Sequence, residues 1–432
     1  MKKNLWIWNH YATNMYKDRA GRHYWFAENL VRNGYNPTIF CASTNHFSDE
    51  NIDTKGKKHI TDLQDGISFV FVNTPNYKGN GKKRIYNMIS FYRKLFPVAK
   101  EYAKLNGKPD VILASSVHPL TLVAGIKNAK KFKIPCICEV RDLWPESIVA
   151  YGALKRNSLV AKILYQGEKW IYKKADSIIM TWEGGREYIV DQGWEKTIDL
   201  NKVNHISNGV VIDSFDRNSE ENQVIDSDLD NEDYKNIVYA GSIRKVNNVG
   251  LLLDAAKIIQ NQGSNQIRFL IYGSGDESEM LKQRCENEGI RNVIFKGRVE
   301  KKYIPYILKK AYVNILHNSS TSLDKYGQSQ NKFFEYLAAG KCIVQTYSTG
   351  YSICNRYNCG ICAPVQNPEE IAKYLQKIAR SSYRLNKAMA DPVNISLATM
   401  LGVITHMEKE VKKLDKEIAK IMKSIPQTLT SV

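Results

Sequence analysis

Three polar side chains share one side of a short predicted helix in the last third of the chain. Asn331 and Glu335 are four residues apart in SQNKFFEYLAAGKCIV (residues 329–344), and Lys332 lies beside them. Residues at this spacing are neighbours on a helix surface. An amide, an ammonium and a carboxylate near a helix N-terminus suit an anionic ligand that carries hydroxyl groups. The opposite side is apolar and should pack into a core (Phe334, Leu337, Ala338).

Two cations follow a predicted strand in the stretch VYAGSIRKVNNVG. Arg244 and Lys245 stand between this strand and the next helix. With the free amides of a helix start they form a clamp for a diphosphate, or else they are a solvated pair of charges. In YGSGDE (residues 272–277), Gly273 begins a Gly-x-Gly that lacks the third glycine of a dinucleotide fingerprint. We interpret it as a tight turn near a nucleotide.

The loop after the first predicted strand contains Gly21, Arg22 and His23. Glycine lets the backbone approach a phosphate closely, and loops at the carboxyl ends of strands are where open α/β sheets bind ligands. We therefore expect a phosphate-facing loop. The alternative is that Gly21 only shapes the turn and His23 is partly buried.

A second polar loop, RDLWPES (residues 141–147), follows another predicted strand. Asp142 and Glu146 can orient sugar hydroxyls or act as acid and base, and Trp144 can offer a stacking face. The alternative is that an Asp or Ser caps the next helix and that Trp144 belongs to the core.

These loops need parallel strands to position them. Short β-rich runs alternate with helical patterns, which predicts an α/β fold of two tandem doubly wound, Rossmann-like domains. The first strands are predicted at residues 4–10, 37–43, 110–116, 134–140 and 176–181, and the second set at 236–242, 268–275, 292–298, 312–318 and 341–347. We interpret the acidic stretch 216–236 as a solvated loop.

The expected domains are residues 1–205 and 206–390, followed by a helical segment at 391–432 that either packs back on the first domain or extends toward a partner. A chain of 432 residues exceeds what one core usually supports, and 43% hydrophobic residues argue against disorder.

The net charge of +18 is unevenly distributed. Residues 1–205 hold 32 Lys and Arg against 19 Asp and Glu, whereas the rest of the chain holds 30 against 25. The excess predicts an anionic partner on the N-terminal side, either nucleic acid or an acidic membrane surface. Segment 82–104 mixes cations with aromatic and apolar residues, as an interfacial helix does, although a surface helix with its apolar side in the core fits equally.

Several classes of protein are disfavoured. The eight cysteines have no regular spacing and the N-terminus soon becomes polar, so we expect a reducing cytosol and free thiols. Cys359 and Cys362 have CxxC spacing but lack the companions of a zinc site. No apolar run approaches the length of a membrane-spanning helix, and there is no P-loop, zinc-protease motif or Ser-His-Asp ordering.

Five stretches in order resemble the retaining glycosyltransferases of family 4, which have the GT-B fold, and within them the bacterial capsule and O-antigen branch. They are GRHYWFAENLVRNGYNPTIF, RDLWPES, SNGVVIDSF, VYAGSIRKVNNVGLLLDAA and SQNKFFEYLAAGKCIV, and the resemblance covers about residues 1–390. It implies two Rossmann-like domains facing a cleft, with the acceptor on the N-terminal side and a nucleotide sugar held mainly by the C-terminal domain.

The resemblance also implies roles for single residues. Glu335 would hold the ribose hydroxyls, and Arg244 with Lys245 would neutralise the departing diphosphate. With the loop analysis, the candidates are Glu335, Asn331, Lys332, Gly21 and Gly273 for donor binding, Arg244, Lys245 and Asp142 for catalysis, and Arg22, His23, Trp144 and Glu146 for the acceptor side.

The chain departs from the family pattern at three positions. The residue eight places before Glu335 is Gly327, where the family often has a first Glu. Ser242 and Asn247 occupy places where many members have Arg and Lys. We take Arg244 and Lys245 as their substitutes.

The expected activity is transfer of a hexosyl or N-acetylhexosaminyl group from a nucleotide sugar, with uridine diphosphate as the expected nucleotide, to a lipid-linked or growing surface glycan. No metal or other cofactor is expected, and nucleic acid is not an expected partner. The expected location is the cytoplasm, at the inner face of the membrane through segment 82–104. The alternatives are a nucleotide-sugar epimerase on the same fold and a non-enzymatic protein that binds membranes or nucleic acid.

Overall fold

The computed structural model describes residues 2–46, 48, 50–79, 81–116 and 118–388, together with residues 416 and 420; for residues 381–388 only the backbone is described. The helical segment predicted at 391–432 therefore lies outside the described residues, apart from those two positions. The chain forms two compact units that divide between Ser207 and Asn208.

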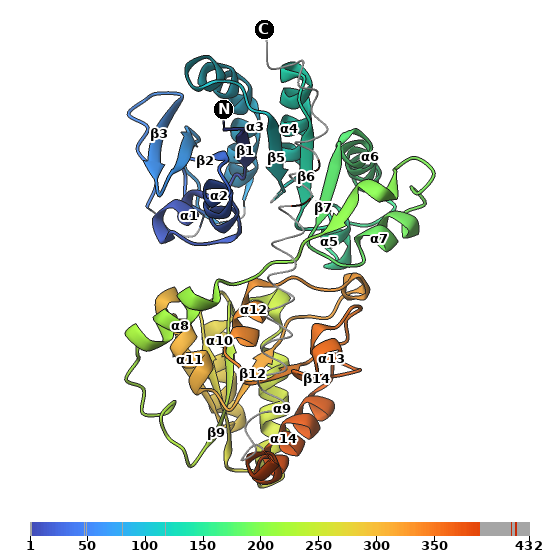
Figure 1. Cartoon of the computed structure of the whole chain (residues 1–432). Coiled ribbons are helices and arrows are strands. Elements are labelled where there is room, and N and C mark those ends of the chain that lie inside the picture. The colour runs from blue at the N-terminus through green and yellow to red at the C-terminus, as the bar shows by residue number, and fades with distance from the viewer. Residues whose placement is uncertain are drawn as a thin grey trace. The chain divides into compact units, whose positions relative to one another are not determined.

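The N-terminal unit is an eight-stranded sheet in the order β3-β4-β2-β1-β5-β6-β7-β8 (Figure 1). All neighbours are parallel except β3 and β4. The strands are β1 (Asn4–Trp8), β2 (Asn36–Ala42), β3 (His59–Gln64), β4 (Ile67–Val72), β5 (Val111–Ser115), β6 (Cys136–Val140), β7 (Ser177–Met180) and β8 (Val203–His205). The helices are α1 (Thr13–Asp18), α2 (Arg22–Arg32), α3 (Lys82–Asn106), α4 (Pro119–Phe132), α5 (Glu146–Ala150), α6 (Leu159–Lys174) and α7 (Gly185–Asp191).

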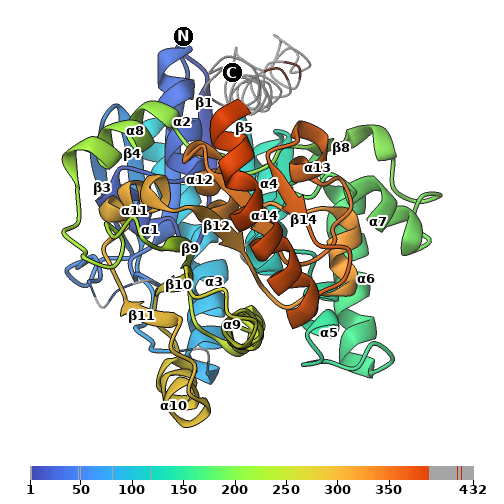
Figure 2. The same cartoon turned by 90° about the horizontal axis from the view of Figure 1, so that it is seen from below.

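The C-terminal unit is a six-stranded parallel sheet in the order β11-β10-β9-β12-β13-β14 (Figure 2). Its strands are β9 (Lys235–Ala240), β10 (Ile267–Tyr272), β11 (Val293–Gly297), β12 (Val313–Leu316), β13 (Cys342–Gln345) and β14 (Gly360–Cys362). Its helices are α8 (Ile212–Glu221), α9 (Gly250–Asn261), α10 (Ser278–Glu288), α11 (Ile304–Lys310), α12 (Asn331–Ala338), α13 (Ile353–Tyr357) and α14 (Pro368–Ala388).

Both sheets are covered on two faces, and this explains the sequence of their central strands. Every residue of β5, β6 and β10 is buried, because helices pack on both sides of a parallel sheet. Separate apolar clusters fill the two faces of the second sheet, with α9 and α14 on one and α8, α11 and α12 on the other. The predicted fold of two doubly wound α/β domains is confirmed.

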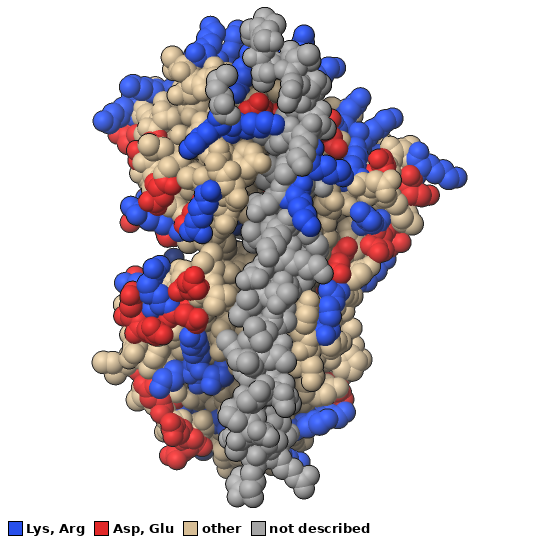
Figure 3. Space-filling view, in the orientation of Figure 1, with Lys and Arg blue, Asp and Glu red and all other residues tan. Residues whose placement is uncertain are grey.

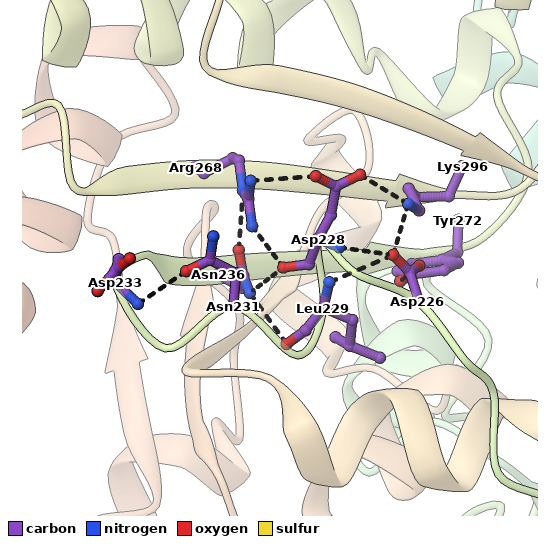
Figure 4. A network of polar contacts seen from close by, with 9 residues as sticks. All are labelled: Asp226, Asp228, Leu229, Asn231, Asp233, Asn236, Arg268, Tyr272 and Lys296. Atoms are coloured by element: carbon purple, nitrogen blue, oxygen red, sulfur yellow. Dashed lines mark hydrogen bonds and ion pairs between the residues drawn. The ribbon is translucent and has the colours of Figure 1, made fainter.

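The acidic stretch 216–236 is only in part the solvated loop that we predict, since residues 222–234 are irregular and mostly exposed. Its first residues belong to α8, and Asp226 and Leu229 are buried. Asp226 accepts hydrogen bonds from Lys296 Nζ at 2.6 Å and from the Tyr272 hydroxyl at 2.7 Å, while Arg268 pairs with Asp228 at 3.2 Å (Figure 4). Burial opposes the charge of Asp226, but the hydrogen bonds from Lys296 and Tyr272 keep its pKa below the usual value.

The basic segment 82–104 lies in α3, and its central apolar residues, Phe91 and Leu95, are fully buried. Near its N-terminal end Ile85, Tyr86 and Ile89 are exposed. No helix in the described part of the chain is long and apolar enough to span a membrane. Figure 3 shows Lys and Arg side chains spread over the visible face of the N-terminal unit.

Candidate functional site

Helix α12 presents polar side chains at its N-terminal end and buries its other side. Asn331 is its first residue and is exposed, and the Glu335 carboxylate, one turn later, forms an ion pair with Lys301. Phe333 and Phe334 are fully buried in the core of the C-terminal unit. Because Lys301 is largely exposed, a ligand that bonds to Glu335 can displace it at little cost.

Lys332 is the one cation of α12, and its surroundings are unusual for a lysine. Its Nζ donates a hydrogen bond to the His317 carbonyl oxygen at 2.7 Å and lies 4.9 Å from the centre of the Tyr239 ring. Burial lowers the pKa of Lys332 to about 7. Burial also lowers the pKa of His317 to about 4, so that imidazole is neutral near pH 7. The ammonium therefore sits in a site that favours an incoming negative charge.

The turn after β9 exposes Arg244 and Lys245. The Ser242 hydroxyl donates to Asn247 Oδ1 at 2.8 Å, so the two residues that depart from the family pattern close this turn on each other. Neither Ser242 nor Asn247 is a cation. The side chains of Arg244 and Lys245 are exposed to solvent.

Hydrogen bonds join the β9 turn to the end of β12. The Ser319 amide donates to the Val246 carbonyl at 3.0 Å, and His317 Nε2 lies 2.8 Å from the Asn248 carbonyl oxygen. Since Lys332 bonds to the His317 carbonyl, the β9 turn and the start of α12 lie at one edge of the sheet. This edge offers guanidinium and ammonium groups beside a carboxylate, which suits a diphosphate joined to a group with hydroxyls.

Two glycines are required by the backbone at this edge. Gly273 has φ +148°, and a Cβ there would lie 1.8 Å from the Gly241 carbonyl oxygen. Gly273 thus lets the β10 loop pack against the β9 turn. Gly327 has φ +99°, a conformation that a Glu side chain rarely adopts, so the missing first Glu coincides with a turn that favours glycine.

The entry to α12 is held by residues whose role the sequence did not reveal. The Asn208 amide donates to Ser329 Oγ at 2.7 Å, and Gln330 Nε2 donates to Asn318 Oδ1 at 2.7 Å and to the Tyr347 hydroxyl at 3.1 Å. Asn208 belongs to the SNG stretch that supported the family resemblance, but the sequence did not indicate its partner.

In the N-terminal unit, Gly21 precedes α2 with φ +110°, and the two residues after it point inward. Arg22 Nε donates to Glu139 Oε1 at 2.7 Å, and His23 Nε2 lies 2.7 Å from Glu139 Oε2. Both side chains are buried and hold the Glu139 carboxylate in the core, and their role on the acceptor side stays a prediction. Despite burial, Arg22 and His23 keep the pKa of Glu139 well below its usual value.

The RDLWPES loop divides into exposed and buried parts. Asp142 is exposed and Trp144 is partly exposed, so both can still meet a ligand. Glu146 is buried and accepts hydrogen bonds from the Tyr165 hydroxyl at 2.7 Å and from Gln192 Nε2 at 3.2 Å. Through Oε2, Glu146 links α5 to α6 and to Gln192 at the end of α7, and its predicted place on the acceptor side stays a prediction.

Sequence reasoning missed a histidine pair at the ends of β1 and β5. His10 Nδ1 lies 2.6 Å from His118 Nε2, and the His10 ring stacks on Phe91 with centroids 4.4 Å apart. Burial lowers the pKa of both, that of His118 to about 3, so both rings are neutral. The sequence signal was a histidine after each of two buried strands, in NLWIWNH and DVILASSVH.

No group of His, Cys, Asp and Glu within the described residues is arranged to hold a metal ion. Among the residues that the structure describes, Cys359 and Cys362 belong to no such group.

Models of known protein families match both units. Residues 24–214 match the family Glycosyltransferase Family 4, and residues 221–391 match the family Glycosyl transferases group 1. The comparison with curated proteins found no match.

Solved structures share the fold over nearly the whole chain. Sucrose-phosphate synthase from Thermosynechococcus elongatus is 15% identical with a TM-score of 0.67, covering 98% of this chain and 100% of that one. Anabaena HepE in complex with UDP is 14% identical with a TM-score of 0.61, with the same coverage. UDP-GlcNAc 2-epimerase from Neisseria meningitidis, bound to UDP-GlcNAc, is 13% identical with a TM-score of 0.51, covering 94% and 100%.

Proposed function

We propose that this chain, a glycosyltransferase of the group 1/family 4 type with two Rossmann-like units, transfers a hexosyl or N-acetylhexosaminyl group from a UDP-sugar. The acceptor is a hydroxyl of a lipid-linked or growing surface glycan of the bacterial capsule or O-antigen kind. The observation that carries the proposal is that hydrogen bonds through His317 join the β9 turn, which carries two exposed cations, to the start of α12, which carries Lys332 and Glu335. HepE supports the choice of nucleotide, since its structure contains UDP.

The proposed reaction retains the configuration of the sugar. The bond between the sugar carbon and the diphosphate oxygen breaks, and the acceptor oxygen forms a new bond on the same face. The acceptor proton passes to the departing phosphate oxygen. Negative charge grows on the diphosphate in the transition state, so Arg244, Lys245 and Lys332 accelerate the step by stabilising it. In this proposal Glu335 and Asn331 hold the nucleotide, Gly21 belongs to a phosphate-facing loop, Asp142 takes part in catalysis and Trp144 offers a face to the acceptor.

Membrane contact belongs to the same proposal. Ile85, Tyr86 and Ile89 are exposed at the N-terminal end of α3, close in sequence to Lys82 and Lys83. This arrangement supports a peripheral position at the inner face of the membrane, where a lipid-linked acceptor would be met.

The test replaces the two exposed cations of the β9 turn. Arg244→Ala with Lys245→Ala should lower turnover by about a hundredfold or more while leaving unfolding unchanged, since both side chains point to solvent. The control is Arg291→Ala with Lys282→Ala, which removes one cation of α10 and one that follows it in the same unit. Equal activity of the two double variants would remove the clamp from the mechanism.

An epimerase is the second candidate, because UDP-GlcNAc 2-epimerase shares the fold. Product analysis with the acceptor omitted separates the two. A transferase leaves the donor sugar unchanged without an acceptor, whereas an epimerase converts it.

A further inference from the structure

Helix α6 carries an apolar stripe that the N-terminal unit does not cover. Leu159, Val160 and Ile163 are 74%, 57% and 62% exposed, and Trp170 is 37% exposed. Their spacing places all four on one side of the helix, with Gly167 between them. The opposite side is buried against the rest of the unit, beside α4 (Figure 1).

Within α6, cations border this stripe and no exposed acid does. Lys162, Lys169, Lys173 and Lys174 lie on the same helix, and Lys162, Lys173 and Lys174 are exposed. The one acid of α6, Glu168, is buried and accepts hydrogen bonds from two tyrosine hydroxyls at 2.7 and 2.8 Å. The outer face of α6 therefore has the composition of a helix that lies in the headgroup region of an acidic membrane.

We propose that α6 docks the N-terminal unit on an anionic lipid bilayer. The apolar stripe enters the boundary between headgroups and acyl chains, and the lysines contact anionic headgroups. Charge complementarity favours this occupant over a second copy of the chain, because self-association through α6 would bring two lysine-rich helix faces together, and α6 itself supplies no exposed acid to pair with them.

This surface differs from the one expected at α3. Helix α3 buries Phe91 and Leu95 and leaves apolar side chains exposed only near its N-terminal end, whereas the stripe of α6 runs from Leu159 to Trp170. Docking through α6 does not depend on sugar transfer, so the two proposals are tested separately.

The test is co-sedimentation of the full chain with vesicles of phosphatidylcholine alone and of phosphatidylcholine mixed equally with phosphatidylglycerol. We expect binding to the mixed vesicles only, weakening as salt is added. Ile163→Glu should lower that binding by about thirtyfold, the loss expected when one large apolar side chain is withdrawn from an apolar environment. Replacing Lys162 and Lys173 by Gln should lower it about fivefold for each lysine.

Two control variants make the test specific. Ile225→Glu changes a fully exposed isoleucine of the C-terminal unit and should leave binding unchanged. Ile85→Glu changes the exposed end of α3. Circular dichroism confirms that each variant is folded, which we expect because every replaced side chain is exposed.

Three results would overturn the proposal. One is binding to mixed vesicles that Ile163→Glu leaves intact, and another is binding that Ile85→Glu abolishes while Ile163→Glu does not. The third is a dimer in sedimentation velocity that Ile163→Glu dissociates, because it would make a second copy the occupant of α6.

Discussion

Lys332 should make nucleotide binding depend on pH near neutrality. Its ammonium is held by the His317 carbonyl and the Tyr239 ring, and burial lowers its pKa to about 7. His317, which follows β12, contacts it and is neutral, and Glu335, three residues later on the same helix, is paired with Lys301. A bound diphosphate adds negative charge beside Lys332 and should return its pKa toward the ordinary lysine value.

The size of the effect follows from this pKa. At about pH 7 half of the free protein carries the ammonium, and at about pH 9 only about one molecule in a hundred does. If only the charged form binds tightly, the affinity for UDP should fall by about fiftyfold over this range. Binding at about pH 7 should also take up about half a proton for each nucleotide bound.

The assay is calorimetric titration with UDP at several pH values, in buffers with different heats of ionisation. UDP itself titrates, so Lys332→Arg is the matched control: it keeps the cation but cannot lose its proton in this range. The wild type should take up protons on binding and lose affinity at high pH, beyond the changes that Lys332→Arg shows. The same pH dependence in both proteins would refute the assignment.

Three further outcomes test the structure. Gly273→Ala should disturb the β9 turn and weaken UDP binding, because the new Cβ would meet the Gly241 carbonyl oxygen. Denaturant unfolding measures the disturbance of the fold, and calorimetry measures the loss of UDP affinity. Burial raises the pKa of Glu168 to about 8, so the folded state binds more protons than the unfolded one, and stability should fall as pH rises from about 5 to about 8. Urea unfolding should show a flatter profile in Glu168→Gln, and an unchanged profile would contradict this. Arg22→Met should destabilise the protein by about 3 kcal/mol by leaving Glu139 charged and underpaired, and Glu139→Gln added to it should restore part of that loss in thermal unfolding.

The sequence predicted the repeating architecture because parallel strands buried on both faces are continuous apolar runs that periodicity detects. It missed β3, whose HITDLQ residues are mostly polar and partly exposed because β3 is an antiparallel edge strand. It also missed the short strands β8 and β14, and β4, although the ISFVFV residues of β4 are an apolar and largely buried run. The buried residues of the acidic stretch 216–236 were not predicted, for a different reason. Its composition is that of a solvated loop, but its partners, Lys296 and Arg268, lie far away in the sequence.

For the candidate site, the sequence indicated local neighbours on a helix but not contacts between residues far apart in the chain. Spacing within α12 identified Asn331, Lys332 and Glu335, because neighbours on a helix are fixed by local geometry. Spacing along the chain could not show that Arg22 and His23 turn inward, since Glu139 is more than a hundred residues away. The same holds for the pairing of His10 with His118.

The central claim is that the C-terminal unit binds a nucleotide through α12. Its most direct test is calorimetric titration of the purified protein, without added metal, against the diphosphates of uridine, guanosine and adenosine, repeated with Glu335→Ala. We predict that UDP binds and that Glu335→Ala abolishes or strongly weakens this binding. Failure of all three nucleotides to bind, or UDP binding that Glu335→Ala leaves unchanged, would contradict the account.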